Sequence, residues 1–224
     1  LIFPTWIAPL FNKFTPLQDV ALKDRIDALA KRCDFAIQGL FVMDGSKRSA
    51  HGNAYFTGFG KSRRIVFFDT LLSKLSPTEI EAVLAHELGH FKHKHIVKRL
   101  AMSLVGSLLM FALLGWLSQQ PWFFTGLGVA PLANGNNGMA LLLFFLVMPV
   151  FTFMLTPLTS WLSRRDEFEA DRFAASQSQA SDLVSALVKL FNDNAATLTP
   201  DPVHSAFYDS HPPATIRIQA LSAA

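Results

Sequence analysis

The feature that most constrains the fold is a long stretch of sequence without any charge. From Leu100 to Ser163 there is no Asp, Glu, Lys, Arg or His. Two strongly apolar segments lie inside it, Leu100–Leu117 and Met139–Leu158, and each approaches the roughly 20 residues that cross a bilayer as a helix. The connector "SQQPWFFTGLGVAPLANGNNG" is rich in turn residues, with the Trp and Phe typical of membrane interfaces. The pattern predicts a transmembrane helical hairpin.

Basic residues flank this hairpin at both of its outer ends. They are Lys92, Lys94, Lys98 and Arg99 before the first segment, and Arg164 and Arg165 after the second. A hairpin returns the chain to the side that it left, and the positive-inside bias makes that side cytoplasmic. The alternative is a buried hairpin in a soluble protein, but a chain of 224 residues can hardly cover such helices on every face. We therefore expect an integral, multi-pass membrane protein.

Composition excludes several classes of function. The net charge of +3 is small and dispersed, so nucleic acid is not an expected partner. The single cysteine, Cys33, rules out an internal disulfide framework and a cysteine-based zinc cluster, and we interpret it as a thiol in the core. The chain begins with Leu1, and "LIFPTWIAPLF" lacks the features of a signal peptide. We expect the C-terminal part of a longer membrane protein.

The segment before the hairpin predicts a helix and a small sheet. Thr15 and Pro16 resemble the start of a helix over residues 17–33. Three segments rich in β-branched and aromatic residues follow, "IQGLFVMD", "HGNAYFTGF" and "RRIVFFDTL", which favour a small antiparallel sheet. The overall prediction is a mainly α fold with a small antiparallel β-sheet.

A second helix begins at "SPTE", where Ser76 and Glu79 form a capping-box pattern. Nothing in the sequence breaks this helix before the membrane segment. Pro149 and Pro157 should kink the second membrane segment. After "SRRDEFEADRFAAS", a helical pattern, two short helices are expected near Asp182–Asn192 and Ala214–Ser222, around the loop "TPDPVHSAFYDSHPP".

The helix that begins at "SPTE" carries the motif HELGH. His86 and His90 are four residues apart, so both imidazoles project from one face of a helix and can bind one zinc ion. Glu87 can reach a water at that ion without being a ligand, which is the geometry of HExxH zinc proteases. Zinc would lower the pKa of this water, and Glu87 would take its proton as general base. The alternative is a polar helix face with solvated histidines.

A catalytic zinc needs a third protein ligand and an open position. One class of zinc protease has a histidine six residues after the second ligand and a glycine three residues after it, but Ile96 and His93 stand there. His93 shares the helix face, but three ligands along two helical turns rarely converge. We expect His93 and His95 to be solvated or near lipid headgroups.

The segment "EFEAD" supplies a better third ligand. Glu167 and Asp171 face the same way on a predicted helix, so one can bind zinc while the other accepts a hydrogen bond from a ligating imidazole. Glu167 is the candidate ligand. The alternative is a solvated acidic patch that also includes Asp166 and Glu169. The hairpin argues against it, because it brings this helix back beside HELGH.

The motifs "HELGH", "SRRDEFEAD", "KRSAHGNAYFTGFGKSRRIVFFDTLL" and "SHPPATIRIQAL" closely resemble the type I CAAX prenyl endoproteases, membrane zinc metallopeptidases of the gluzincin clan. The resemblance runs from about Ile7 to Leu221. It implies His86, His90 and Glu167 as ligands of one zinc ion, Glu87 as catalytic base and Asp171 as the partner of a ligand. It also implies transmembrane helices around a chamber that opens to the cytoplasm. Eukaryotic members remove the last three residues of prenylated CAAX proteins.

The resemblance divides the chain, a single peptidase domain, into three parts. Residues 1–99 hold the first helix, the sheet and HELGH, residues 100–163 the hairpin, and residues 164–224 the third ligand and the final helices. The family has about five membrane segments ahead of this region, which agrees with a C-terminal part. The short link between sheet and HELGH resembles bacterial members, so we expect one, in the inner membrane. The substrate would be a peptide or protein, membrane-associated or C-terminally lipidated.

Further roles are expected around the zinc. The tetrahedral oxyanion of peptide hydrolysis needs a donor besides the metal, and the family suggests His211 in "SHPP". Tyr208 is an alternative donor, and His211 could instead be an ordinary turn residue. An edge strand can hold an extended substrate, which points to Asn53 and Ala54 in "HGNAYF".

Arg164 and Arg165 have two possible roles. Either both are anchors at the membrane interface, or one is the buried partner of active-site carboxylates, as the family pattern suggests. Three alternatives remain for the whole protein: an HtpX-like quality-control protease, a catalytically inactive membrane scaffold, and a soluble metalloprotease. The intact Glu87 argues against a scaffold, and the uncharged hairpin argues against a soluble protein.

Overall fold

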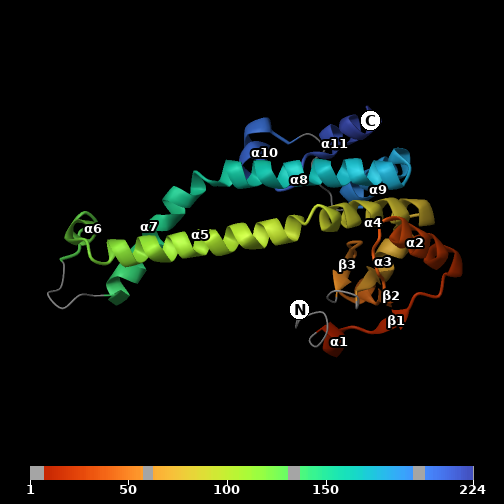
Figure 1. The fold of residues 1–224 in the computed structure, drawn as a ribbon, viewed down its shortest axis with the longest axis horizontal. Helices are drawn as coiled ribbons and strands as arrows, with labels where there is room; N and C mark the ends of the chain where they lie inside the picture. The colour runs from red at the N-terminus through yellow and green to blue at the C-terminus, as the bar shows by residue number, and fades with distance from the viewer. Residues whose placement is uncertain (1–7, 58–62, 131–136, 194–199, 224) are drawn as a thin grey trace.

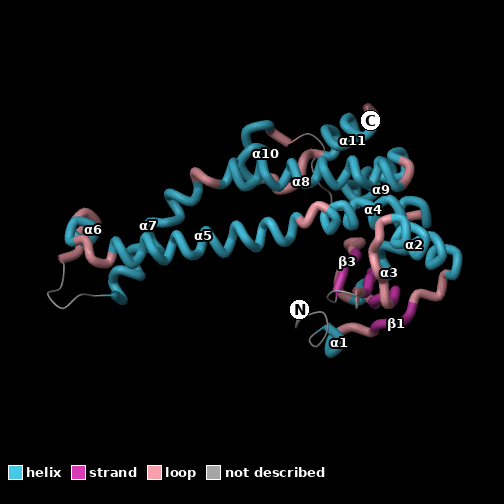
Figure 2. The backbone as a smooth tube through the Cα atoms, viewed as in Figure 1, coloured by secondary structure: helices cyan, strands magenta, loops and turns pink. Residues whose placement is uncertain are grey.

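A computed structural model describes residues 8–57, 63–130, 137–193 and 200–223 of the chain. Figure 1 shows a packed region that contains the sheet and most helices, and a long arm that extends from it. The tube in Figure 2 shows that helix dominates both parts, with the few strands confined to the packed region. The mainly α prediction is therefore confirmed.

The sheet has four strands, β1 (Phe14–Pro16), β2 (Gly39–Met43), β3 (Ala54–Thr57) and β4 (Arg64–Phe68), in the order β1-β2-β4-β3. β1 and β3 pair antiparallel with their neighbours, whereas β2 and β4 are parallel. The sheet is mixed, and the prediction of an antiparallel sheet was wrong. β4 carries three consecutive buried apolar residues, Ile65, Val66 and Phe67. A strand buried on both faces belongs inside a sheet, so β4 lies between β2 and β3.

The N-terminal helices differ in detail from their prediction. After α1 (Ala8–Phe11), Thr15 and Pro16 pair with β2 in strand β1 and do not start a helix. α2 (Val20–Arg32) begins later because the Asp19 side chain accepts a hydrogen bond from the Leu22 amide. Cys33 ends α2 and is partly buried against the core. The 3₁₀ turn η2 (Gly45–Lys47) and α3 (Asp69–Lys74) complete this part.

α4 (Pro77–Lys92) carries HELGH and has the predicted capping box at Ser76 and Glu79. Its prediction was wrong at the other end, because the helix stops before the apolar segment. Lys94 adopts a left-handed backbone with φ +57°, and α5 (His95–Leu117) starts after it. L side chains rarely adopt this conformation. The break separates the HELGH helix from the first helix of the arm.

The arm consists of α5, α6 (Pro121–Thr125) and α7 (Asn137–Phe153), with α5 and α7 side by side in Figure 1. A small cluster at its far end includes Phe123, Phe124 and Phe144. By length and composition α5 alone could cross a membrane. α7 qualifies only together with α8 (Thr156–Gln177), from which it is bent by 56°. The bend lies between Pro149 and Pro157, where a kink was expected.

The C-terminal helices close the packed region. α9 (Ala180–Asp193) and α11 (Ala214–Ser222) occur where short helices were predicted. Between them α10 (Pro202–Tyr208) occupies a segment expected to be a loop, because Asp201 caps the amides of Val203 and His204. The main core joins α2, α4, α9 and the sheet through Ile26, Leu29, Ile65, Phe67, Ile80, Leu84 and Leu183.

Glu79 connects α4 to α9 and gives a test of this packing. Its carboxylate accepts hydrogen bonds from Lys189 at 2.7 Å, from Ser185 at 2.5 Å and from the Ser76 amide at 2.7 Å. Burial raises the pKa of Glu79, but these bonds outweigh it and lower the pKa to about 2. Because the folded-state pKa lies below the ordinary value, the stabilisation is complete above about pH 4.5 and is lost as the pH falls toward 2.

We expect Glu79→Gln to reduce the free energy of unfolding by about 2 kcal/mol at pH 7, the scale of hydrogen bonds to a charged group. The difference from the unsubstituted protein should shrink as the pH falls from 4.5 toward 2. Chemical denaturation at several pH values measures both. Asp24→Asn, on an exposed face of α2, is the control and should change little. A difference independent of pH would contradict the charge-based explanation.

Candidate metal centre

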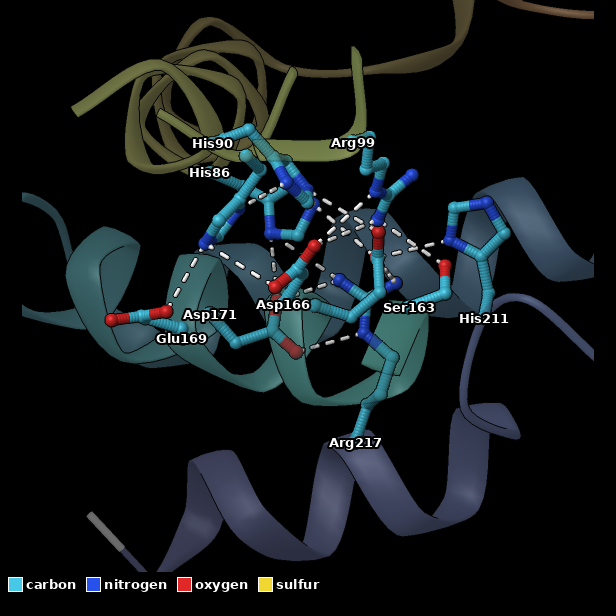
Figure 3. A network of polar contacts seen from close by, with 11 residues as sticks. His86, His90, Arg99, Ser163, Asp166, Glu169, Asp171, His211 and Arg217 are labelled. Carbon is cyan, nitrogen blue, oxygen red and sulfur yellow. Dashed lines mark hydrogen bonds and ion pairs between the residues drawn. The ribbon is translucent and has the colours of Figure 1, made fainter. Parts of the chain in front are cut away.

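α4 and α8 lie side by side across the packed region (Figure 1) and approach very closely at one point. A Cβ atom added to Gly89 would lie 2.9 Å from Cα of Ala170 on α8. A glycine in HELGH is therefore needed for the two helices to approach. This contact brings the histidines of α4 against the acidic residues of α8, as Figure 3 shows.

Three side chains from these helices converge at one point. Nε2 of His90 lies 3.2 Å from Nε2 of His86 and 3.2 Å from Oε1 of Glu167. Nε2 of His86 lies 3.5 Å from Oε2 of Glu167. Ligands at zinc–nitrogen and zinc–oxygen bond lengths in a tetrahedron are separated by roughly 3.3–3.6 Å. The two histidine nitrogens and the two carboxylate oxygens of Glu167 therefore lie at about the spacing of ligands around one zinc ion, and the three residues lie close enough to share a metal ion.

Glu167 is buried at this point although it is acidic. Its side chain is 3% exposed, and its Oε2 has no hydrogen-bond partner among the described residues. Glu167 follows the predicted membrane segment, which ends at Leu158, and is therefore outside it. Burial raises the pKa of Glu167, but close contacts with His211, His86 and His90 outweigh this and hold the pKa far below its usual range. A buried carboxylate that remains ionised requires positive charge beside it.

His86 is held from its other ring nitrogen by Asp171 and Arg217. Nδ1 of His86 lies 2.8 Å from Oδ1 of Asp171. Burial lowers the pKa of His86, but the contacts with Asp171 and Glu167 outweigh it and raise the pKa to about 9. The cluster thus favours a positive charge even when only a proton is available.

Arg217 on α11 was not predicted as a site residue. Its guanidinium donates two hydrogen bonds to Asp171, at 2.8 and 2.5 Å, and its Nη1 lies 3.4 Å from Oε2 of Glu167. Figure 3 shows it reaching the cluster from the final helix. Such a two-point arginine–carboxylate pair fixes the carboxylate geometry. The sequence signal was a single cation among the apolar residues of "ATIRIQAL".

Of the two histidines beyond HELGH, one differs from its prediction. His95 is 1% exposed and contacts His90, whereas His93 forms an ion pair with Glu169 at 3.0 Å. The prediction that both are solvated or near lipid headgroups was wrong for His95, because the turn at Lys94 directs it inward.

His211 belongs to the cluster, but its side chain is largely open to solvent. Its Nδ1 lies 3.0 Å from Oε2 of Glu167, while 64% of the side chain is exposed. Tyr208 is also exposed and packs on the ring of His204. Both line a cavity of about 580 Å³ that Arg217 borders as well. The cavity adjoins the cluster through His211 and Arg217, which both contact Glu167.

The remaining candidates lie further from the cluster. Arg164 donates to the carbonyls of Ser205 and Asp209 at the end of α10, and Arg165 is exposed. The family pattern implied that one of these two arginines pairs with the buried carboxylates of the site. Arg217 has this role instead, because α11 packs against α8 on the side where Asp171 lies. Glu87 follows His86 on α4 and is partly buried.

Asn53 and Ala54 lie at the start of β3, the outer strand of the described sheet. The Asn53 carbonyl accepts from the Phe68 amide of β4. Because backbone groups alternate along a strand, the Ala54 amide points to the outer edge, where the Asn53 side chain accepts from it at 2.8 Å.

Comparison with known proteins identifies the family. Residues 16–224 match the sequence profile of Peptidase family M48. The chain belongs to this family. The chain is 39% identical over 238 residues to CAAX prenyl protease 1 of Saccharomyces cerevisiae, and the alignment covers 98% of the chain and 51% of the relative. It is 38% identical to the human CAAX prenyl protease 1 homolog, with 98% and 54% covered.

A solved structure gives the same result for the M48 fold. The crystal structure of S. mikatae Ste24p matches 98% of this chain and 54% of its own, with a TM-score of 0.87 and 38% sequence identity. The chain spans about half the length of the relatives that it matches. These matches confirm the resemblance to CAAX prenyl proteases that the motifs indicated.

Proposed function

We propose that this chain carries the catalytic centre of a membrane-embedded zinc metalloendopeptidase of the CAAX prenyl protease type. The observation that carries the proposal is the convergence of His86, His90 and Glu167, whose ring nitrogens and carboxylate oxygens lie close enough to share one metal ion. Membership of family M48 and the similarity to CAAX prenyl proteases support the reaction class.

The donor set fits a zinc ion better than it fits a network of hydrogen bonds. If Nδ1 of His86 donates to Asp171 and Nδ1 of His90 donates to His95, both Nε2 atoms carry lone pairs. These lone pairs face one another at 3.2 Å beside an ionised carboxylate. A cation between them removes this repulsion: a proton on His86 does so in the metal-free cluster, and a zinc ion does so when it is bound. Two imidazoles and one carboxylate, with a fourth position open, form a known type of catalytic zinc site.

Each residue of the site has its own role in peptide hydrolysis. When bound, zinc supplies a Lewis acid that polarises a peptide carbonyl and lowers the pKa of water. Glu87 accepts a proton from the attacking water and returns it to the leaving amine. His211, exposed beside the cluster, donates a hydrogen bond to the oxyanion, with Tyr208 as the alternative donor. Asp171, fixed by Arg217, holds His86 with its Nε2 toward the ion.

The substrate is an extended peptide that adds to the outer edge of the sheet. Ala54 presents an amide at this edge, and the Asn53 side chain that now accepts from it can give way to a substrate carbonyl. As for the CAAX prenyl proteases that the chain resembles, the substrate is a prenylated C-terminal peptide from which the last three residues are removed.

The arm lies in the membrane. Leu100, Leu109 and Phe111 on α5 and Phe145 and Leu146 on α7 are each more than three-fifths exposed. Such a contiguous apolar surface is unfavourable in water and suits a lipid environment. The basic residues at both ends of the hairpin support a cytoplasmic position for the cluster. α5, α7 and the first residues of α8 then form the membrane hairpin between the HELGH helix and the third ligand, which lies further along α8.

The test is cleavage by the full protein purified in detergent. We expect a farnesylated CAAX peptide to lose its C-terminal tripeptide, detected by mass spectrometry, and the same peptide without the farnesyl group to react much more slowly. A metal chelator should stop the reaction, and added zinc should restore it. Cleavage of unfolded membrane proteins without cleavage of CAAX peptides would instead favour the HtpX-like alternative, and no cleavage at all would favour a scaffold.

A further inference from the structure

His95 contacts the metal-binding cluster through a second histidine, and the proposed reaction does not use it. It is the first residue of α5 and is 1% exposed. Its Nδ1 lies 2.9 Å from Nδ1 of His90, and its Nε2 lies 3.1 Å from Oε2 of Glu169. A buried imidazole therefore joins His90 to a carboxylate on α8.

The break in the helix after α4 creates this contact. In a continuous helix, residues five apart are rotated by about 140° around the axis, so His95 would point away from His90. Lys94 takes the left-handed conformation instead, and α5 restarts with His95 turned toward α8. A left-handed backbone is unfavourable for a residue other than glycine, so the surrounding contacts must hold Lys94 in place.

The geometry dictates where the protons lie. Nε2 of His90 faces Glu167 and His86, so as a metal ligand this nitrogen must be unprotonated. The proton of His90 is then on Nδ1, and the only orientation open to it is donation to Nδ1 of His95. His95 accepts at Nδ1, so its own proton is on Nε2, which donates to Glu169.

We propose that His95 is a positioning residue for the metal site: its neutral imidazole accepts the Nδ1 proton of His90 and holds Nε2 of His90 toward the metal. This inference rests on the proposed role of His90 as a ligand. The two histidine ligands are then held differently, His86 by the carboxylate of Asp171 and His90 by a neutral ring. A partner of this kind fixes both the tautomer and the orientation of a ligand.

A second metal ion is the competing explanation, because His95, Asp166 and Glu169 also lie close enough to share one. An ion at Nε2 of His95 would force the proton of His95 onto Nδ1. Nδ1 of His90 would then have to accept, and its Nε2 would carry a proton and could not bind zinc. In addition, Arg99 already donates to Asp166 at 3.2 Å. The observations therefore favour positioning.

Zinc affinity, measured by competition with a chelator, separates positioning from packing. His95→Leu keeps most of the volume but removes the acceptor, and we expect it to bind zinc about 10–100-fold more weakly. His95→Asn keeps an acceptor near the position of Nδ1 and should restore affinity to within about threefold of the unsubstituted protein. His93→Leu is the matched control, since His93 also contacts Glu169 and stacks on the His95 ring, whereas Nδ1 of His90 is contacted by His95. It should bind zinc normally.

Three outcomes would overturn the proposal: normal affinity in His95→Leu, equal weakening in His95→Asn, or equal weakening in His93→Leu. The thermal midpoint of each metal-free variant reports whether it folds. If His95→Leu does not fold, ¹⁵N chemical shifts of the His95 ring in the zinc-loaded, unsubstituted protein decide, and a proton on Nδ1 would refute the proposal. If the unsubstituted protein binds no zinc, the ligand assignment itself fails, which is a different result.

Discussion

Replacement of Glu87 by glutamine should lower peptide hydrolysis by about 10²–10⁴-fold while zinc remains bound. The carboxamide keeps the size of the side chain and its hydrogen bonding, but it cannot accept a proton from water at neutral pH. General-base assistance contributes a rate factor of this size. Glu87 is not among the three converging donor groups, so the metal content should not change.

The measurement is kcat on a CAAX peptide together with zinc content by mass spectrometry. Glu81→Gln is the matched control, because Glu81 lies on the same helix but pairs with Arg25 and Arg32 away from the cluster. It should retain activity within a few-fold, although its stability should fall. Parallel loss of zinc and activity in Glu87→Gln would make Glu87 structural. Undiminished cleavage would assign the general base to another group.

The second large effect is loss of the metal when Glu167 is removed. We expect about one zinc per chain in the unsubstituted protein and almost none in Glu167→Ala, His86→Ala or His90→Ala, because two ligands rarely hold a catalytic zinc. Zinc content of protein purified in limiting metal measures this. His93→Ala should retain the ion, since His93 pairs with Glu169 on the periphery of the cluster.

Glu167→Ala also removes a negative charge that is buried beside Arg217. We therefore expect the variant to be less stable, and its thermal midpoint is compared with that of the metal-free unsubstituted protein. Retention of zinc in Glu167→Ala, with loss in His93→Ala, would show that the ligand set is wrong.

Local sequence patterns determined the centre of the site. The four-residue spacing in HELGH sets two imidazoles on one face of α4, and the capping box at Ser76 and Glu79 starts that helix. Glu167 followed from the same spacing argument applied to α8, combined with a hairpin that returns the chain. These features depend on residues within one or two helical turns, so the sequence alone could predict them.

Contacts between distant segments could not be predicted in this way. The central position of β4, which makes the sheet mixed, reflects a choice of strand neighbours that local patterns do not encode. Arg217 reaches Asp171 only because α11 packs against α8, which also leaves Arg164 to bind the end of α10.

The left-handed Lys94 is the clearest case of a feature decided by tertiary structure. No glycine or proline marks a break there, so the local pattern favours one continuous helix. The break is maintained because it buries His95 between His90 and Glu169, and these contacts offset the local cost of the backbone. Sequence determined which side chains could bind a metal, and tertiary packing decided which neighbours orient them.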